Sequence, residues 1–282
     1  MLFEFWQNFT HNLFKPLLLF FYFGFLIPIL KVRVEFPHVI YQALTMYLLL
    51  AIGWHGGEEL AEINPSSVGR IAGFMSVGFA LNFLIGIAAY FLLNHMTVVR
   101  RIDRATVAGY YGSDSAGTFA TCVAVLTGAV IVGFISGLQG QKVIHDNDTF
   151  FVSAFQGVLC LFLLEMGMTA SRKLKDLRSV GFGFIFFGLL TPNIFATLGI
   201  IVAHSYGYLI HTEFKPGTYV LFAVLCGAAS YIAVPAVQRL AIPEASPSLP
   251  LAASLGLTFS YNVTIGIPLY MEIARIVAEH SP

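Results

Sequence analysis

The feature that most constrains this chain is a series of long apolar segments separated by short polar connections. A helix needs about 20 consecutive apolar residues to cross the hydrocarbon core of a bilayer, and most of the segments reach that length. Only 11% of the residues are charged, whereas soluble domains carry about 25%. The sequence therefore predicts an all-α polytopic membrane protein of about nine helices. The predicted spans are 16–30, 38–56, 68–94, 104–126, 127–139, 151–170, 180–206, 216–240 and 249–278.

Basic residues in the connections predict the orientation of these spans. Ten of the fifteen Lys and Arg residues lie at 31–33, 98–104, 172–178 and Arg239, and the connections between these are acidic or neutral. Because cytoplasmic loops carry the excess of Lys and Arg, we place these four connections in the cytoplasm and the N-terminus outside. The net charge is zero, which gives no reason to expect a nucleic-acid partner.

The two halves of the chain resemble each other. Residues 41–60 align without gaps on 155–174, with five of twenty positions identical, and a long apolar helix follows in both copies. Each copy then reaches a segment rich in small residues, GYYGSDSAGTF at 109–119 and LCGAASYIAVP at 225–235. The charged ends of the two copies are reversed relative to the membrane. This pattern predicts inverted-topology repeats of about five helices each with broken helices at the centre, the usual build of a secondary transporter.

The interrupted segments have the composition of an anion site. A helix that begins within the membrane exposes unpaired N–H groups and the positive end of its dipole. Small residues let the backbone approach a ligand, and hydroxyls add donors. The first segment supplies Gly112, Ser113, Ser115, Gly117 and Thr118, and the second supplies Gly227, Ala228, Ala229 and Ser230. The alternative is that these small residues only let helices pack closely.

Two carboxylates, Asp114 and Glu165, lie within apolar segments. Carboxylates at such positions are costly unless paired, and by default they indicate a function. Close packing gives no reason for Asp114, whose oxygens are suited to bind Na⁺ or to carry a proton. Glu165 is a candidate coupling residue, with a structural hydrogen bond to a hydroxyl as the alternative.

The last span places oxygen-bearing side chains in the middle of a helix. Thr258, Ser260, Asn262 and Thr264 precede Pro268, which distorts the turn before it. Together with carbonyls that the proline frees, such side chains can coordinate a cation. The alternative is a kinked helix whose hydroxyls bond to its own backbone. Because the sequence contains no catalytic motif, we predict that the chain is not an enzyme and uses no organic cofactor.

Three stretches of the sequence are distinctive: YYGSDSAGTF at 110–119, LLEMGMTASRKL at 163–174, and the run from Ala229 to Tyr270. They resemble the sodium-dependent bicarbonate transporter family, known best from cyanobacteria, and look closer to its wider bacterial branch. The resemblance implies ten helices in two inverted repeats, arranged as a gate domain and a core domain, with bicarbonate between the two broken segments of the core. It implies that Gly112, Ser113, Ser115, Ala116, Gly117 and Thr118 face Ala229, Ser230 and Tyr231 across the substrate.

The resemblance also implies a coupling ion, partners and a location. With Na⁺ as the coupling ion, the expected Na⁺ ligands are Asp114, Ser260, Asn262 and Thr264. The expected substrate is bicarbonate or a similar small anion, and the expected setting is the lipid of a bacterial inner membrane. A homo-oligomer, a trimer by resemblance, and a small cytoplasmic regulatory protein are the expected protein partners.

Two departures from the family pattern bear on the expected function. Cyanobacterial members carry an acidic residue after the serines of the second broken segment, where this chain has Tyr231, so the coupling ion or the substrate can differ. The helix that should close the first repeat, together with a cytoplasmic linker, is missing between Leu126 and Thr127. We therefore divide the chain into 1–139, the first repeat plus the opening helix of the second, and 140–282, the remainder of the second.

The leading hypothesis is a secondary active transporter that takes up bicarbonate with Na⁺ by an elevator-like or rocking movement of the core. A Na⁺- or H⁺-coupled transporter of another small carboxylate is the alternative within the same class. A transport-inactive membrane receptor or scaffold is the alternative from a different class, because one helix of the expected set is missing.

Overall fold

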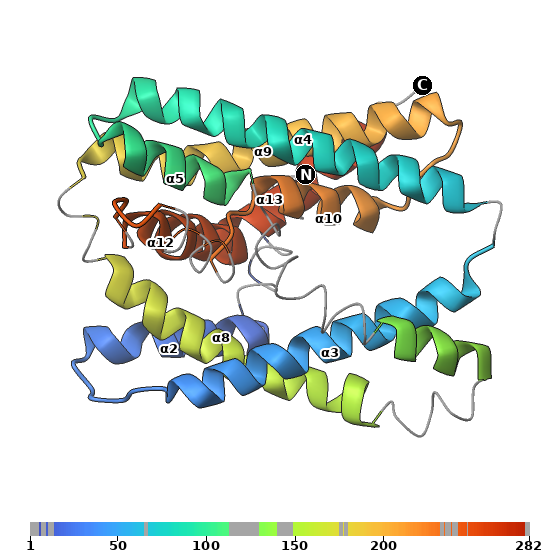
Figure 1. Ribbon diagram of the computed structural model, residues 1–282, viewed down its shortest axis with the longest axis horizontal. Helices are drawn as coiled ribbons and strands as arrows, with labels where there is room; N and C mark the ends of the chain where they lie inside the picture. The colour runs from blue at the N-terminus through green and yellow to red at the C-terminus, as the bar shows by residue number, and fades with distance from the viewer. Residues whose placement is uncertain are drawn as a thin grey trace. The chain divides into compact units, whose positions relative to one another are not determined.

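A computed structural model describes residues 6, 10, 14–64, 67–112, 130–139, 149–174, 177, 180–231, 234, 238, 242–246 and 248–279. All regular structure within these ranges is helical, which confirms the predicted all-α fold class (Figure 1). The described helices include four that are long and apolar enough to cross a membrane: Val39–Glu59, Val68–Met96, Phe150–Lys173 and Phe182–Leu209. Large side chains on their outer faces are exposed, as expected of surfaces that meet lipid; Phe79 and Phe83 of the second helix are 80% and 64% exposed.

The chain forms two compact units, and each takes segments from both halves of the sequence. The smaller unit consists of residues 16–69 and 117–168, and the larger unit consists of 1–15, 70–116 and 169–282. The predicted division into 1–139 and 140–282 concerns the sequence repeats and stays a prediction.

Helices in the smaller unit cross closely where glycine replaces a side chain. Its described elements are α2 (Pro16–Ile29), α3 (His38–Glu62), the helix Val130–Gln139, η2 (Thr149–Ser153) and most of α8 (Ala154–Lys173). A Cβ at Gly24 of α2 would lie 2.0 Å from the Leu164 carbonyl oxygen of α8, so a larger residue there would push the two helices apart. The Trp54 ring of α3 stacks on Phe151 of η2 with ring centroids 4.9 Å apart.

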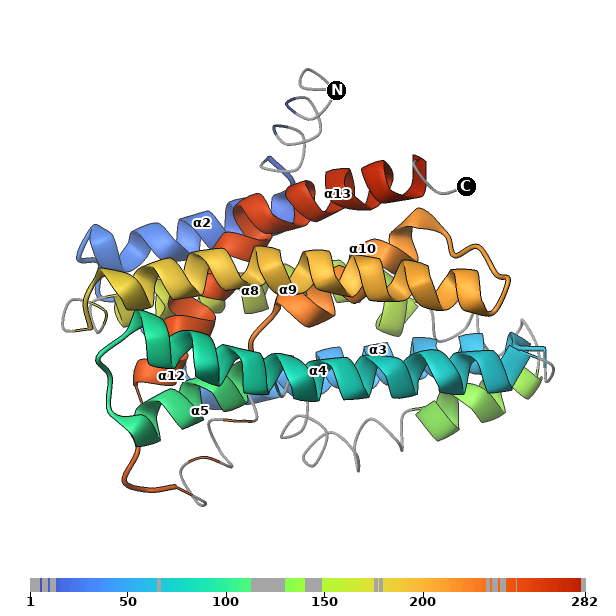
Figure 2. The same ribbon diagram turned by 90° about the horizontal axis from the view of Figure 1, so that it is seen from above.

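The larger unit contains the longest helices and an aromatic core. Its elements are α4 (Val68–Met96), α5 (Arg101–Tyr111), α9 (Phe182–Leu209), α10 (Pro216–Gly227), α12 (Leu249–Leu251), η4 (Ala252–Phe259), η5 (Asn262–Gly266) and α13 (Ile267–Glu279). Helices α9, α10 and α13 contact one another, and α5 contacts α12 and η4 (Figures 1 and 2). The core between them includes Tyr111, Phe187, Phe195 and Tyr270, each at most 2% exposed.

The last predicted span, 249–278, is a continuous run of α- and π-helical turns. The π-helical turns occupy 252–259 and 262–266 and precede Pro268, which has no N–H to donate and would crowd the carbonyl of Thr264 in a regular α-helix. The predicted proline distortion is therefore present, but wide turns spread it over two segments instead of concentrating it in one kink.

Candidate functional site

Both predicted helix interruptions begin where the sequence indicates. Helix α5 ends at Tyr111, and the Gly112 N–H closes its last turn by donating to the Ala108 carbonyl at 3.0 Å. Helix α10 ends at Gly227, and the backbone turns extended at Ala228, with φ −87° and ψ 167°. Gly112 follows α5 and Gly227 is the last residue of α10, and glycine stabilises a helix interior poorly.

The two interruptions meet inside the larger unit. The Ser230 N–H donates to the Tyr110 carbonyl oxygen at 2.7 Å, which joins the second interruption to the last turn of α5. Ser230 and Ala229 are 5% and 4% exposed, so this contact is dry. The structure thus brings together two segments that lie more than one hundred residues apart in the sequence.

Gly112 also lies against α4. A Cβ at Gly112 would lie 2.4 Å from the Cα of Gly86, so only glycine fits this crossing. Close helix packing, the alternative that we considered for the small residues, therefore accounts for glycine at this position. The predicted contact of Gly112 with substrate stays a prediction.

Both interruptions begin at a helix C-terminus, that of α5 and that of α10. Each helix presents carbonyl oxygens and the negative end of its dipole there, equivalent to roughly half an elementary charge. This polarity favours a cation near the junction. The N-terminal helix ends that we predicted for an anion would follow the interruptions, and Ser113, Asp114, Ser115, Ala116, Gly117 and Thr118 lie outside the described residues.

Asn262, a predicted Na⁺ ligand, lies beside the end of α10. Its Nδ2 donates to the Gly227 carbonyl at 2.8 Å, and its Oδ1 accepts from the Tyr270 hydroxyl at 2.7 Å. Asn262 is 5% exposed and Tyr270 is fully buried. Gly227 permits this arrangement, because a Cβ there would lie 2.8 Å from the Pro192 carbonyl oxygen. The amide therefore ties the end of α10 to the last helix, while Oδ1 keeps one lone pair for a further ligand.

The other two predicted Na⁺ ligands of the last helix bond to their own backbone. The Ser260 hydroxyl donates to the Leu255 carbonyl at 3.1 Å, and the Thr264 hydroxyl donates to the Ser260 carbonyl at 2.7 Å. This is the arrangement that the kinked-helix alternative predicts. Both hydroxyl oxygens keep acceptor lone pairs, so a role as cation ligands stays a prediction.

A buried hydroxyl pair, which sequence reasoning did not find, joins α5 to α9. Thr258 donates to the Gly188 carbonyl at 3.0 Å, so the Tyr111 hydroxyl must donate in its 2.6 Å contact with Thr258. Both side chains are fully buried. The sequence indicated Thr258 only as one of the oxygen-bearing side chains of the last span, and gave no signal that it pairs with Tyr111.

Two further predicted residues have identified neighbours. The Tyr231 ring lies edge-on to Phe259 of η4, with ring centroids 5.1 Å apart. Glu165 belongs to the smaller unit, on α8, where its carboxyl lies close enough to Tyr41 of α3 for an electrostatic interaction. Its predicted coupling role stays a prediction.

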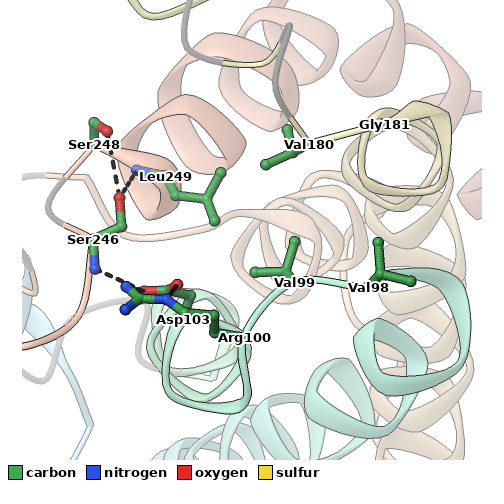
Figure 3. A pocket seen from close by; sticks show the side chains of 9 residues that line it. All are labelled: Val98, Val99, Arg100, Asp103, Val180, Gly181, Ser246, Ser248 and Leu249. Carbon is green, nitrogen blue, oxygen red and sulfur yellow. Dashed lines mark hydrogen bonds and ion pairs between the residues drawn. The ribbon is translucent and has the colours of Figure 1, made fainter.

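An open pocket of about 480 Å³ lies at the N-terminal end of α5 (Figure 3). It is lined by Val98, Val99, Arg100, Asp103, Val180, Gly181, Ser246, Ser248 and Leu249, none of which was predicted as a site residue. Sequence reasoning treated residues 98–104 as a basic loop, yet the Asp103 side chain is only 6% exposed and binds Arg100 with Nε 2.7 Å from Oδ2. In the sequence, only the spacing of three residues between Arg100 and Asp103 indicated that these two side chains could pair.

Comparison with known proteins identifies the family. The sequence model of the Na⁺-dependent bicarbonate transporter superfamily matches residues 16–128 and 120–275, which include both interruptions and most of the last helix. No curated protein sequence matches the chain. A transporter family implies a membrane protein that is not an enzyme, and the four described helices that are long and apolar enough to cross a membrane agree with a membrane protein. The match covers most of the chain, which therefore belongs to the Na⁺-dependent bicarbonate transporter superfamily.

Proposed function

We propose that the chain is a secondary active transporter that takes up bicarbonate together with Na⁺, and that both bind where the two helix interruptions meet. The observation that carries the proposal is the contact between Ser230 N–H and the Tyr110 carbonyl, 2.7 Å apart. Irregular backbone survives at membrane depth only where protein buries it or where it lines a cavity. Two interruptions in contact, in a chain of this family, have the features of a midplane ligand site.

The distribution of segments between the two units supports an origin in inverted repeats. The smaller unit takes α2 and α3 from the first half of the chain, and Val130–Gln139 and α8 from the second. The larger unit takes the pairs α4–α5 and α9–α10, each of which ends at an interruption. Corresponding segments thus belong to the same unit, as expected if each half repeats one plan.

Within the site, the polarity of the helix ends suggests separate places for the two ions. Na⁺ is favoured near the carbonyl ends of α5 and α10, where Asn262 lies. The proposed Na⁺ ligands are Asp114, Ser260, Asn262 and Thr264. Bicarbonate is proposed to bind residues of the two interruptions, away from the Asp114 carboxylate, because like charges would repel. The proposed bicarbonate-binding residues are Gly112, Ser113, Ser115, Ala116, Gly117, Thr118, Ala229, Ser230 and Tyr231.

Uptake of labelled bicarbonate into proteoliposomes tests the proposal. An inward Na⁺ gradient should drive accumulation, and replacing Na⁺ by choline or K⁺ should abolish it. Uptake that persists without Na⁺ but collapses with a protonophore would replace Na⁺ coupling by H⁺ coupling. Uptake of labelled formate or acetate in place of bicarbonate would support another small carboxylate as substrate.

One observation favours the alternative of a transport-inactive receptor or scaffold. The family match consists of two ranges that overlap at 120–128, around the predicted gap between Leu126 and Thr127. A helix missing there would remove part of the expected cation site. Failure to take up any small anion, from protein that remains folded in the liposomes, would favour this alternative. The homo-oligomer, the cytoplasmic partner, the inner-membrane location and the outside N-terminus stay predictions.

A further inference from the structure

The segment between the second interruption and the last helix is held against α5 by polar contacts. Its described residues include Gln238 and 242–246, and Ser246 lies on one wall of the pocket at the N-terminal end of α5 (Figure 3). Both backbone groups of Ser246 are bonded. The N–H donates to the Asp103 Oδ1 at 2.7 Å, and the carbonyl accepts from the Gln238 Nε2 at 3.0 Å.

Asp103 is the anchor of this segment on α5. It is 4% exposed, and Arg100 donates to its two oxygens at 2.7 Å and 3.2 Å. The Arg100 guanidinium also reaches the Glu244 carbonyl at 3.4 Å. Arg100 lies outside the membrane-spanning segments, and its hydrogen bond to Asp103 and the negative charge of that residue raise the pKa of Arg100 above its ordinary value.

Gln238 connects the anchored segment to the interruption. Its Oε1 accepts from the Tyr110 hydroxyl at 2.6 Å, and both residues are buried, at 5% and 0% exposure. Tyr110 follows Asp103 by seven residues, about two helical turns, so the two side chains lie on the same face of α5. The carbonyl of this same Tyr110 accepts from the Ser230 N–H. Tyr110 thus binds the anchored segment through its side-chain hydroxyl and the second interruption through its backbone carbonyl.

We propose that Asp103, Gln238 and Tyr110 form a clamp of positioning residues that holds the two interruptions in register for ligand binding. The inference rests on the proposed function, because it assumes that ligand binds where the interruptions meet. Apolar packing could hold the same segment in place but would tolerate sliding. Buried hydrogen bonds are directional and costly to leave unmade, so they fix one register.

Two variants remove the clamp with little change in volume. Tyr110→Phe removes the hydroxyl that donates to Gln238. Gln238→Met removes the hydrogen bonds of the Gln238 amide to Tyr110 and to Ser246, while keeping the length of the side chain. Each should raise the bicarbonate and Na⁺ concentrations that give half-maximal uptake by about tenfold, the factor expected for one lost hydrogen bond. The double variant should be no worse than Gln238→Met alone, because Tyr110→Phe removes only a hydrogen bond that Gln238→Met has already removed. Tyr208→Phe, at a side chain that is 71% exposed on α9, is the matched control.

A second readout separates the clamp from transport. Hydrogen exchange at the Ser230 amide should be faster in Tyr110→Phe and Gln238→Met than in the wild type and in Tyr208→Phe. If the wild type transports nothing but exchange responds in this way, the proposed function fails and the clamp stands. If the wild type transports but neither exchange nor the half-maximal concentrations change, or if only the amount of folded protein falls, the clamp is overturned.

Discussion

The crossing of Gly86 and Gly112 allows a substitution whose effect can be worked out from the structure. In Gly112→Ala the new methyl would lie 2.4 Å from the Gly86 Cα, 2.8 Å from the Gly86 nitrogen and 3.2 Å from the Asn82 carbonyl oxygen. All three are backbone atoms, so no change of rotamer relieves the overlap. Because ordinary contacts begin at 3.4 Å, the end of α5 and α4 must separate by about 1 Å.

This separation should lower stability by a measurable amount. Adding a methyl to a packed core costs about 1–3 kcal/mol, which corresponds to a fall in Tm on the order of 5 °C for a chain of this size. The folded fraction after heating in detergent, followed by size-exclusion chromatography, measures the change. Gly109→Ala is the matched control on the same helix, because a Cβ there meets nothing within 4 Å. The control should be neutral or slightly stabilising, since alanine favours helix.

Gly86→Ala distinguishes packing from ligand contact at this crossing. Its methyl would lie 2.9 Å from the Gly112 Cα, so it perturbs the same contact from α4 without adding an atom at the interruption. If Gly112 contacts the substrate, Gly112→Ala should lose more uptake than Gly86→Ala at equal loss of Tm. A Gly112→Ala protein as stable as Gly109→Ala would refute the close crossing and the reasoning built on it.

Three further predictions concern the cation and the buried hydroxyls. Asp114→Asn should reduce Na⁺-driven bicarbonate uptake at least about tenfold by removing the charged ligand, whereas Glu59→Gln, at a side chain that is 70% exposed, should not; equal losses would contradict the role of Asp114. Adding Na⁺ but not K⁺ should raise the Tm of the wild type, because a ligand of the folded state contributes about 2.7 kcal/mol at one hundred times its Kd, and this rise should be absent in Asp114→Asn. Thr258→Val should lower the free energy of unfolding by about 0.5–1.5 kcal/mol by removing one hydrogen-bond partner of Tyr111, since Thr191 also hydrogen-bonds that hydroxyl, while Ser76→Ala, an exposed hydroxyl on α4, should change the Tm little.

Hydropathy and length predicted most of the helices. The spans expected at 68–94 and 180–206 are the helices Val68–Met96 and Phe182–Leu209, within three residues at either end. Bilayer thickness fixes the length of such segments, so local composition is sufficient to find them. The starts of the two interruptions were predictable for a related reason, because a cluster of glycine, serine and alanine in an otherwise oily helix is a local signal.

The contacts that assemble the site could not be predicted in this way. The Tyr110 hydroxyl meets Gln238 across 128 residues of sequence, and Tyr111 meets Thr258 across 147. Helices that are apolar on all sides carry almost no periodic signal, so the sequence does not tell which face turns inward. The π-helical turns before Pro268 were also missed, because proline indicates a distortion without specifying how many residues share it.

An interrupted helix frees carbonyl groups that a membrane cannot hydrate, and this chain satisfies them by cross-bonding its own interruptions. The Tyr110 carbonyl at the first interruption accepts from Ser230 of the second, and the Gly227 carbonyl at the second accepts from Asn262 of the last helix. Asn262 is therefore needed to hold the second interruption whether or not Na⁺ binds. Loss of uptake in Asn262→Ala would not distinguish a ligand from a structural bond. Asp114 is the one charged residue among the proposed Na⁺ ligands, so its substitution is the sharper test of the cation site.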